Sequence, residues 1–236
     1  MRSPFDLSSQ LADFTGTAPL FPLPSSVLFP HILLPLHVFE PRYREMTRDA
    51  LAGPRLIAMA HLMADSSKAS GGICPIHSTV CLGKIAAEER LPDGRFYLVL
   101  QGLSRARLIE ETPQGDRPYR VGRLELLSDD YPDPPVIDRD WHVRKILCGL
   151  RHLFPEVQIE RMLEAAPSRQ IPLGVLCDVL AYAMKLPACA LQDLLQEVDV
   201  DQRSRAIVRH LEVTSRRESQ RAKPTSRVFP PHFSLN

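Results

Sequence analysis

The residues most suited to binding a metal are two cysteines and a histidine that lie close together in the chain. Cys74, His77 and Cys81 form the pattern C-x₂-H-x₃-C, and His61 is a conceivable fourth ligand. Thiolate and imidazole groups are good zinc donors, but three donors of mixed type fall short of a closed structural site. Cys81 also falls in an expected strand, where a small buried side chain simply fills space. We therefore expect no metal and no other cofactor.

Two further short patterns come close to catalytic motifs without completing them. A phosphate-binding loop needs G-x-x-x-x-G-K-[ST], but Gly83-Lys84 has Ser78 at the first glycine position and Ile85 after the lysine. The segment around Ser104 lacks the second glycine of a nucleophile elbow, whose turn is crowded. Nothing in the sequence assembles a nucleophile, a base and an oxyanion site. We expect no catalytic residues and no enzyme activity.

A third group of polar residues lies around the start of an expected helix. His37, Glu40 and Arg42 could form part of a recognition surface. The sequence favours a simpler role, in which Glu40 and Arg42 brace a strand-to-helix corner by hydrogen bonds while Phe39 and Tyr43 enter the core. An acid–base role for His37 would need a cleft and a partner group.

The elements that position these residues are expected to be mainly strands as far as about Leu127. Four prolines between residues 22 and 35 exclude a helix there and limit the segment to short or edge strands. Leu91-Pro-Asp-Gly94 is a turn sequence between two apolar runs and predicts a hairpin. The expected strands cover residues 55–62, 79–87, 95–101, 106–111 and 119–127.

One helix should interrupt the strands, and several more should follow them. Pro41 suits a first helical position, residues 43–51 carry one apolar stripe, and Gly53-Pro54 ends the helix. Tyr131–Pro135 holds three prolines and marks a stiff boundary, beyond which apolar residues recur with a helical period. The expected helical stripes cover residues 143–154, 159–163, 173–184 and 191–198, and a last helix starts near Asp199 or Asp201.

These elements predict an α+β protein with four regions. Residues 1–18 form a flexible arm, residues 19–130 a β domain, residues 136–213 a helical bundle, and residues 214–236 a disordered basic tail. The stretch from Arg203 to Arg227 has eight basic and two acidic residues, a composition that could contact nucleic acid. A solvated helix face with a flexible tail is the commoner explanation, because aromatic residues for base stacking are not interleaved.

Composition narrows the class of protein further. A chain of 236 residues can bury a sizeable core, and a net charge of +1 provides no global field for nucleic acid or membrane partners. The apolar stretches are far shorter than the ~18 residues that span a bilayer, and the N-terminus lacks the apolar run of a secretory signal. Five cysteines, an odd number without C-x-x-C, argue against a disulfide framework. We expect a cytoplasmic protein that does not bind membranes.

Two longer segments resemble the signatures of the Lon protease N-terminal domain family. The first is Phe21-Pro-Leu-Pro-Ser-Ser-Val-Leu-Phe-Pro30 followed by Leu34-Pro-Leu-His-Val-Phe-Glu-Pro-Arg-Tyr43. The second is Leu91-Pro-Asp-Gly-Arg-Phe-Tyr-Leu-Val-Leu-Gln-Gly102, and Leu194–Asp199 is a weaker third. The resemblance covers roughly residues 19–213 and implies a PUA-like β-barrel followed by helices. One departure is His31, where the family usually has glycine.

The resemblance also implies a function. In a complete Lon protease this domain engages substrate and helps assembly, while separate ATPase and Ser–Lys peptidase domains carry out the chemistry. The chain would then be a stand-alone, non-catalytic module that binds unfolded or extended protein segments and could work with a protease partner. The alternative is an RNA-binding protein that uses the barrel and the basic tail, by analogy of fold. The candidate binding residues by position are His31, Ile32, Leu33, His37, Glu40, Arg42 and Met63.

Overall fold

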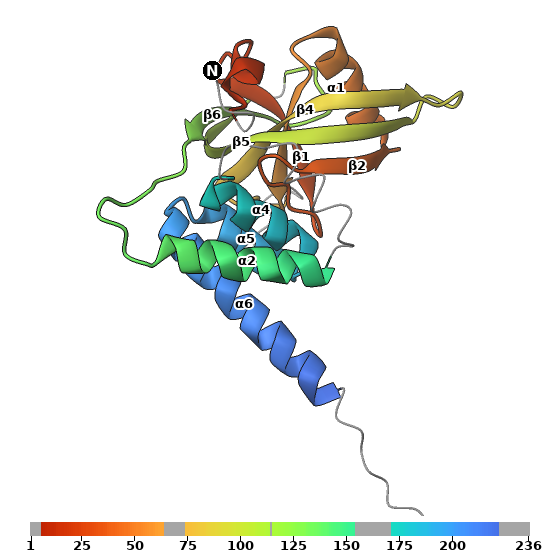
Figure 1. Ribbon diagram of the computed structural model, residues 1–236. Coiled ribbons are helices and arrows are strands. Elements are labelled where there is room, and N and C mark those ends of the chain that lie inside the picture. The colour runs from red at the N-terminus through yellow and green to blue at the C-terminus, as the bar shows by residue number, and fades with distance from the viewer. Residues whose placement is uncertain (1–5, 64–73, 114, 154–170, 222–236) are drawn as a thin grey trace, which may run out of the picture.

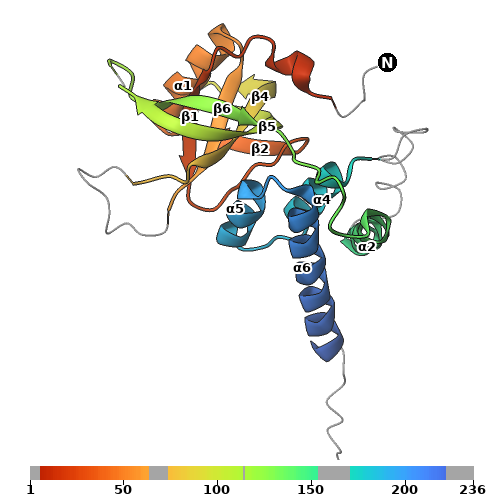
Figure 2. The same ribbon diagram turned by 90° about the vertical axis from the view of Figure 1, so that its left-hand side faces the viewer.

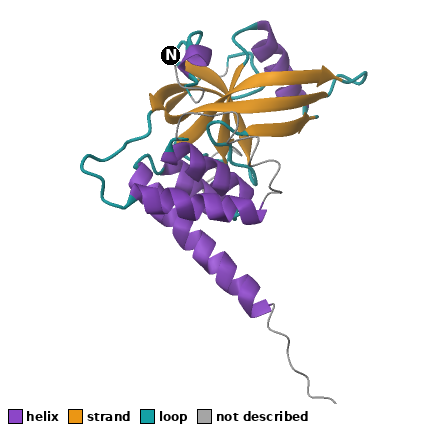
Figure 3. Ribbon diagram, in the orientation of Figure 1, coloured by secondary structure: helices purple, strands orange, loops and turns teal. Residues whose placement is uncertain are grey.

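Strands occupy the first half of the chain and helices the second, in two layers (Figures 1 and 3). The structure is a computed structural model that describes residues 6–63, 74–113, 115–153 and 171–221. For residues 152–153 and 215–221 it describes the backbone alone. The arrangement confirms the predicted α+β class.

Five of the six strands close into a ring. Along the sheet the strand order is β2-β5-β4-β3-β1-β6, and an additional pairing of β5 with β6 closes the barrel. β1 and β3 are parallel, whereas every other described pair is antiparallel. β2 pairs only with β5 among the described strands and therefore extends the sheet beyond the ring. The strands are β1 (Thr17–Leu23), β2 (Leu33–Val38), β3 (Leu56–His61), β4 (Thr79–Arg90), β5 (Phe96–Thr112) and β6 (Val121–Leu127).

The predicted hairpin at residues 91–94 joins β4 to β5. The amide of Leu91 donates to the carbonyl of Arg95 (2.9 Å), and Gly94 adopts the positive φ of +82° that favours glycine. The sequence predicted two separate strands after this turn, but β5 is one strand of 17 residues. The strand passes without a break through a glycine near its middle.

That glycine, Gly102, lets the loop after β1 cross the barrel wall at close range. A Cβ atom at Gly102 would lie 2.0 Å from the carbonyl oxygen of Phe29, far inside van der Waals contact. The crossing is held by two hydrogen bonds, from the amide of His31 to the Gly102 carbonyl (2.8 Å) and from the Gly102 amide to the Ile32 carbonyl (2.9 Å). Only glycine fits at this crossing.

The predicted helix between β2 and β3 is α1 (Pro41–Ala52), with Pro41 in its first turn. Its buried side chains are Tyr43, Met46, Thr47 and Ala50, which agree with the predicted stripe. The N-terminal arm departs from the prediction over residues 6–16. It includes a short 3₁₀ helix, Ser8–Leu11, and three of its side chains pack against a second apolar cluster inside the barrel: Leu7, Leu11 and Phe14.

Four described helices form the C-terminal layer: α2 (Arg139–Leu153), α4 (Leu173–Ala183), α5 (Ala188–Gln196) and α6 (Val200–Arg221). The stripe predicted at residues 159–163 lies outside the described residues. α6 continues to Arg221, into the region predicted as tail, and its far end leads away from the barrel (Figures 1 and 2).

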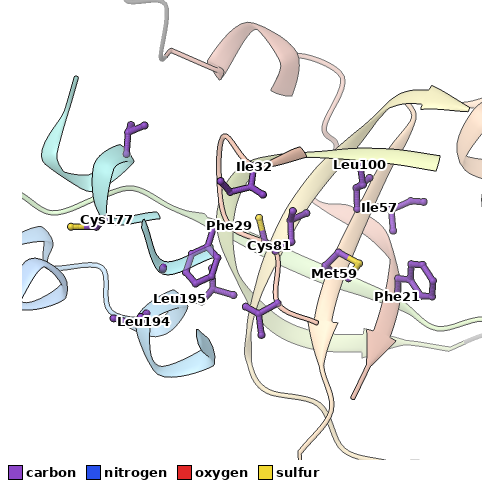
Figure 4. Packing of buried hydrophobic residues seen from close by; sticks show 14 of the residues in the cluster. Phe21, Phe29, Ile32, Ile57, Met59, Cys81, Leu100, Cys177, Leu194 and Leu195 are labelled. Carbon is purple, nitrogen blue, oxygen red and sulfur yellow. The ribbon is translucent and has the colours of Figure 1, made fainter. Parts of the chain in front are cut away.

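A single apolar cluster joins the two layers. Figure 4 shows Leu195 of α5 beside Phe29 of the β part, and Ile32, Cys81, Cys177 and Leu194 belong to the same cluster. The loop that contains Phe29 and Ile32 lies between the barrel and the helices, so these layers share one core. Burial of apolar surface at this junction is the main force that holds the helices on the barrel.

Four charged residues reinforce the junction. Arg105 of β5 binds both carboxylate oxygens of Asp178 of α4 (2.9 and 2.5 Å) and the carbonyl of Leu195 (3.0 Å). Arg203 of α6 lies 2.6 Å from Asp129 of the connector and 3.6 Å from Asp178. The strand, the connector and two helices are thereby linked by buried and partly buried ion pairs.

Candidate functional site

The most unusual surface of the described molecule is the solvent side of β2 and β5. Strand residues alternate between the two faces of a sheet, and on β5 the inward set is Phe96, Leu98 and Leu100, all buried. The outward set is also apolar: Tyr97 is 50 % exposed, and Leu33 of β2 is 55 % exposed. A sheet that faces water normally carries polar residues there.

Aromatic rings gather at one end of this surface. His37 pairs with Tyr97 across the two strands, with their ring centres 4.8 Å apart. Phe39, one residue after β2, is 59 % exposed and lies 5.8 Å from the His37 ring. Exposed rings held in contact with one another form a rigid apolar platform, of a kind often found where a partner binds.

A groove of about 530 Å³ runs beside these rings, and its walls are mainly apolar. Its acidic residues are Glu88, which binds Arg55, and Glu89, which forms no ion pair with any described residue. The lining residues are Pro35, Leu36, His37, Ala87, Glu88, Glu89, Tyr97, Leu98 and Val99. We refer to this groove together with Leu33 and Phe39 as the outer face.

The backbone of β2 limits how a partner can bind at its open edge. The Ile32 carbonyl accepts a hydrogen bond from Gly102, so Leu34, Leu36 and Val38, which have the same parity, direct their backbone groups toward β5. Pro35 therefore belongs to the open edge, where it offers no N–H donor. The outer face is better suited to contacts through side chains than to addition of another strand.

A second hollow, of about 450 Å³, lies between the start of α1 and the ends of β1 and β3. The charged residues that line it are already paired: Arg42 binds Glu40 (3.0 Å), and Arg120 binds Glu111 and the Cys74 carbonyl. Arg42 also stacks over the Tyr43 ring at 4.5 Å. These contacts brace the corner before α1, so we assign no ligand to this hollow.

The predicted binding residues lie in separate parts of the structure. Leu33 and His37 lie on the outer face, whereas Glu40 and Arg42 line the second hollow. Met63 is exposed after β3, next to Leu62 of that hollow. Ile32 was placed on the surface by its position in a loop, but its side chain is 7 % exposed and packs in the shared core.

His31 lies at the junction of barrel and helices rather than on an open surface. Its φ of +68° falls in the left-handed region, which explains why a glycine would suit this position. Burial lowers the pKa of His31, although the nearby carboxylates of Asp178 and Asp129 act in the opposite direction. A neutral, half-buried imidazole beside the ion pairs is a structural feature of the loop.

The sequence prediction missed the residues that make the outer face distinctive. Phe39 was expected in the core and is instead exposed, while Tyr97 and Val99 were treated only as strand residues. A signal for them existed, because residues 96–100 are apolar at consecutive positions in a strand whose hairpin partner ends in charged residues. Apolar residues on both faces of such a strand indicate a second contact surface.

The possible metal ligands do not converge. Cys81 is fully buried in the shared core, and the rings of His61 and His77 stack in parallel with their centres 5.2 Å apart. Within the described residues no group of three or more His, Cys, Asp or Glu side chains could hold a metal ion. The Ser104 hydroxyl donates to the Arg105 carbonyl (2.9 Å) and has a structural role. None of the described helices combines the length and hydropathy required to cross a bilayer.

The family model and the relatives that match this chain indicate the same protein family. The model of the ATP-dependent protease La (LON) substrate-binding domain matches residues 17–213. The Lon protease of Dictyoglomus thermophilum is 27 % identical over 211 residues, which are 86 % of this chain and 25 % of the relative. For the Lon protease of Syntrophus aciditrophicus the identity is 26 % over 235 residues, 93 % of this chain and 29 % of the relative. The chain thus spans between a quarter and a third of the length of these relatives.

Two solved structures share the fold. The N-terminal domain of Mycobacterium avium complex Lon protease aligns with a TM-score of 0.63 at 17 % identity and covers 83 % of this chain and 98 % of that one. A Lon N-terminal domain protein from Xanthomonas campestris aligns with a TM-score of 0.58 at 23 % identity and covers 82 % and 97 %. At these identities the likeness concerns the fold alone.

Proposed function

This chain belongs to the family of Lon substrate-binding domains, and we propose that it is a non-catalytic module that binds unfolded or extended protein segments through its outer face. The observation that carries the proposal is the exposed apolar and aromatic surface formed by Leu33, Phe39 and Tyr97. Contiguous apolar surface of this kind costs solubility and is usually retained where a partner covers it.

The geometry favours apolar side chains of a client as the main binding groups. Rings at Tyr97 and His37 offer flat contact area, and the groove beside them can take a side chain from an extended segment. Because Pro35 interrupts the donors on the open edge of β2, recognition would depend little on backbone pairing. Such contacts tolerate varied sequences, as a module that selects unfolded chains requires.

Binding of fluorescent, unstructured peptides to the purified full chain tests the proposal by fluorescence anisotropy. Apolar peptides should bind, and Tyr97→Ala should weaken their binding about tenfold, because exposed aromatic residues at interfaces contribute a kcal/mol or more. Tyr182→Ala is the matched control, since Tyr182 is 38 % exposed but lies on α4, in the helical layer.

Two results would count against the proposal. One is the absence of binding to any peptide at high micromolar concentration. The other is equal loss of binding in Tyr97→Ala and Tyr182→Ala, which would place the site elsewhere. An RNA titration separates the alternative function: binding that falls steeply with salt and is lost on deletion of residues 216–227 would favour RNA as the ligand.

A further inference from the structure

We propose that the outer face binds residues 227–233 of a second copy of this chain, Arg-Val-Phe-Pro-Pro-His-Phe, so that the protein associates with itself through its C-terminal segment. The inference rests on the proposed function, because it assigns an occupant to the same face. It identifies the partner by three properties of the molecule: the chemistry of the segment, the chemistry of the face, and the direction of α6.

The segment has the composition of a ligand for an aromatic groove. Pro230-Pro231 restricts the backbone to extended conformations and favours the polyproline II helix. Phe229 and Phe233 flank the proline pair, and Arg227 precedes it. Residues 219–236 contain three basic residues and no acidic one. The sequence is apolar and basic, and a proline pair reduces the conformational entropy that a segment loses on binding.

The outer face offers the complementary groups. Proline-rich segments bind in grooves lined by aromatic rings, and here the rings of His37 and Tyr97 lie 4.8 Å apart beside Pro35. Glu89 lies in the same groove, opposite Tyr97 in the β4–β5 register, and forms no ion pair within the described part of the chain. A carboxylate in this position can pair with the guanidinium of Arg227 while the rings contact the prolines.

The direction of α6 indicates that the segment bound at the outer face comes from a second copy of the chain. The amide of Val200 at the start of α6 binds the Asp130 carbonyl (2.9 Å), just after the barrel ends. From there the 22 residues of α6 carry the chain about 33 Å away from the barrel (Figures 1 and 2). Residues 222–226 can span only about 18 Å in return. This span is shorter than the helix whose length it would have to retrace, which favours the face of a second copy over that of the same chain.

Sedimentation velocity of the full chain over a range of concentrations tests self-association. We expect concentration-dependent dimers or larger species that Tyr97→Ala and Phe229→Ala each weaken at least tenfold, whereas Tyr182→Ala leaves them unchanged. A fluorescein-labelled peptide of residues 222–236 should bind the full chain and lose at least tenfold in affinity on Tyr97→Ala.

A charge exchange between copies provides the sharper test. Glu89→Arg and Arg227→Glu should each weaken self-association, because each places like charges together. An equimolar mixture of the two variants should restore it, since each copy then meets an opposite charge on the other. Restoration by mixing requires contact between copies and cannot arise from docking within one chain.

Three results would overturn the inference: a monomer at all concentrations with no binding of the peptide, failure of the mixture to restore association, or association that Tyr97→Ala does not weaken. Failure of this inference alone can be told apart from failure of the proposed function. If unstructured peptides still bind the face in a manner sensitive to Tyr97→Ala, but Phe229→Ala changes neither association nor that binding, the module stands and only its self-recognition is wrong.

Discussion

A buried histidine provides the clearest expectation at the scale of single residues. Nδ1 of His142 on α2 lies 2.6 Å from the hydroxyl of Ser204 on α6, and both side chains are buried between the helices. Burial lowers the pKa of His142 below its usual value of 6.5, because the helix interface solvates an imidazolium poorly. The neutral ring can accept the Ser204 hydrogen bond, and the protonated ring cannot.

This contact should make the free energy of unfolding depend on pH below neutrality. Above about pH 7.5 the ring is neutral in both states and contributes no slope. As pH falls through 6.5, the unfolded chain binds a proton that the folded chain does not, so stability decreases until the lower folded pKa is passed. Urea unfolding at pH 7.5 and 5.5 should show a smaller loss in His142→Gln than in the parent chain, with one proton limiting the difference to about 1.4 kcal/mol per pH unit.

Measurements between pH 8.5 and 7.5 are the internal control, because the two proteins should change in parallel there. Equal losses between pH 7.5 and 5.5 would show that His142 does not couple folding to protonation.

At the scale of elements, the ion pairs around Arg105 decide how the helical layer is held on the barrel. Arg105 and Asp178 are both almost completely buried, and Arg203 lies close enough to share Asp178. Removing charges from water is costly, and the pairs offset that cost only while every member keeps its partner. The network therefore fixes the docking of α4 and α6 more than it adds net stability.

Removal of one partner should be strongly destabilising. Arg105→Met would leave Asp178 buried with only the more distant Arg203, and we expect a loss of about 3 kcal/mol in the free energy of unfolding measured with urea. The double variant Arg105→Met/Asp178→Leu should recover part of the lost stability, because both charges of the buried pair are then removed.

Arg107→Met is the matched control, two residues along the same strand. Its partner Glu125 lies 3.5 Å away and both side chains are more than half exposed, so its removal should change stability far less. Comparable losses from Arg105→Met and Arg107→Met would refute a special role for the buried network.

Elements set by local chemistry were the ones that the sequence predicted well. The turn at Leu91–Gly94 and the start of α1 at Pro41 depend on residues within a few positions of one another. The continuity of β5 through Gly102 and the pairing of β1 with β6 depend on contacts between segments that are distant in the chain. The packing of residues 6–16 against the barrel is of the same kind, so no local pattern indicated it.

The candidate site was predicted only in part, for a similar reason. Leu33 was chosen for its place in the proline-rich loop and His37 as part of a possible recognition surface before α1, and both lie on the outer face. Phe39 was placed in the core because it is apolar, yet the strand alternation that buries Val38 turns its neighbour outward. Arg105, Asp178 and Arg203 lie far apart in the chain, and nothing in their spacing indicated a shared network.

At the scale of the whole molecule, the shared apolar cluster makes barrel and helices one cooperative unit. Cys81 of β4 and Cys177 of α4 both belong to it and are completely buried. Burial raises the pKa of both thiols, and that of Cys177 reaches about 12, so neither supplies a reactive thiolate while the core is closed. Cys148 and Cys189, in contrast, are exposed on the helices.

Alkylation by iodoacetamide, followed by mass spectrometry of each cysteine peptide, should therefore separate two classes. Cys148 and Cys189 should react at the rate of free thiols, whereas Cys81 and Cys177 should react many times more slowly and at a common rate, because both wait for the same opening of the core. In urea below the unfolding midpoint the two slow rates should rise together. If Cys177 were modified well before Cys81, the helices would open independently of the barrel. The buried ion pairs and the shared cluster would then not hold the two layers together as one folding unit.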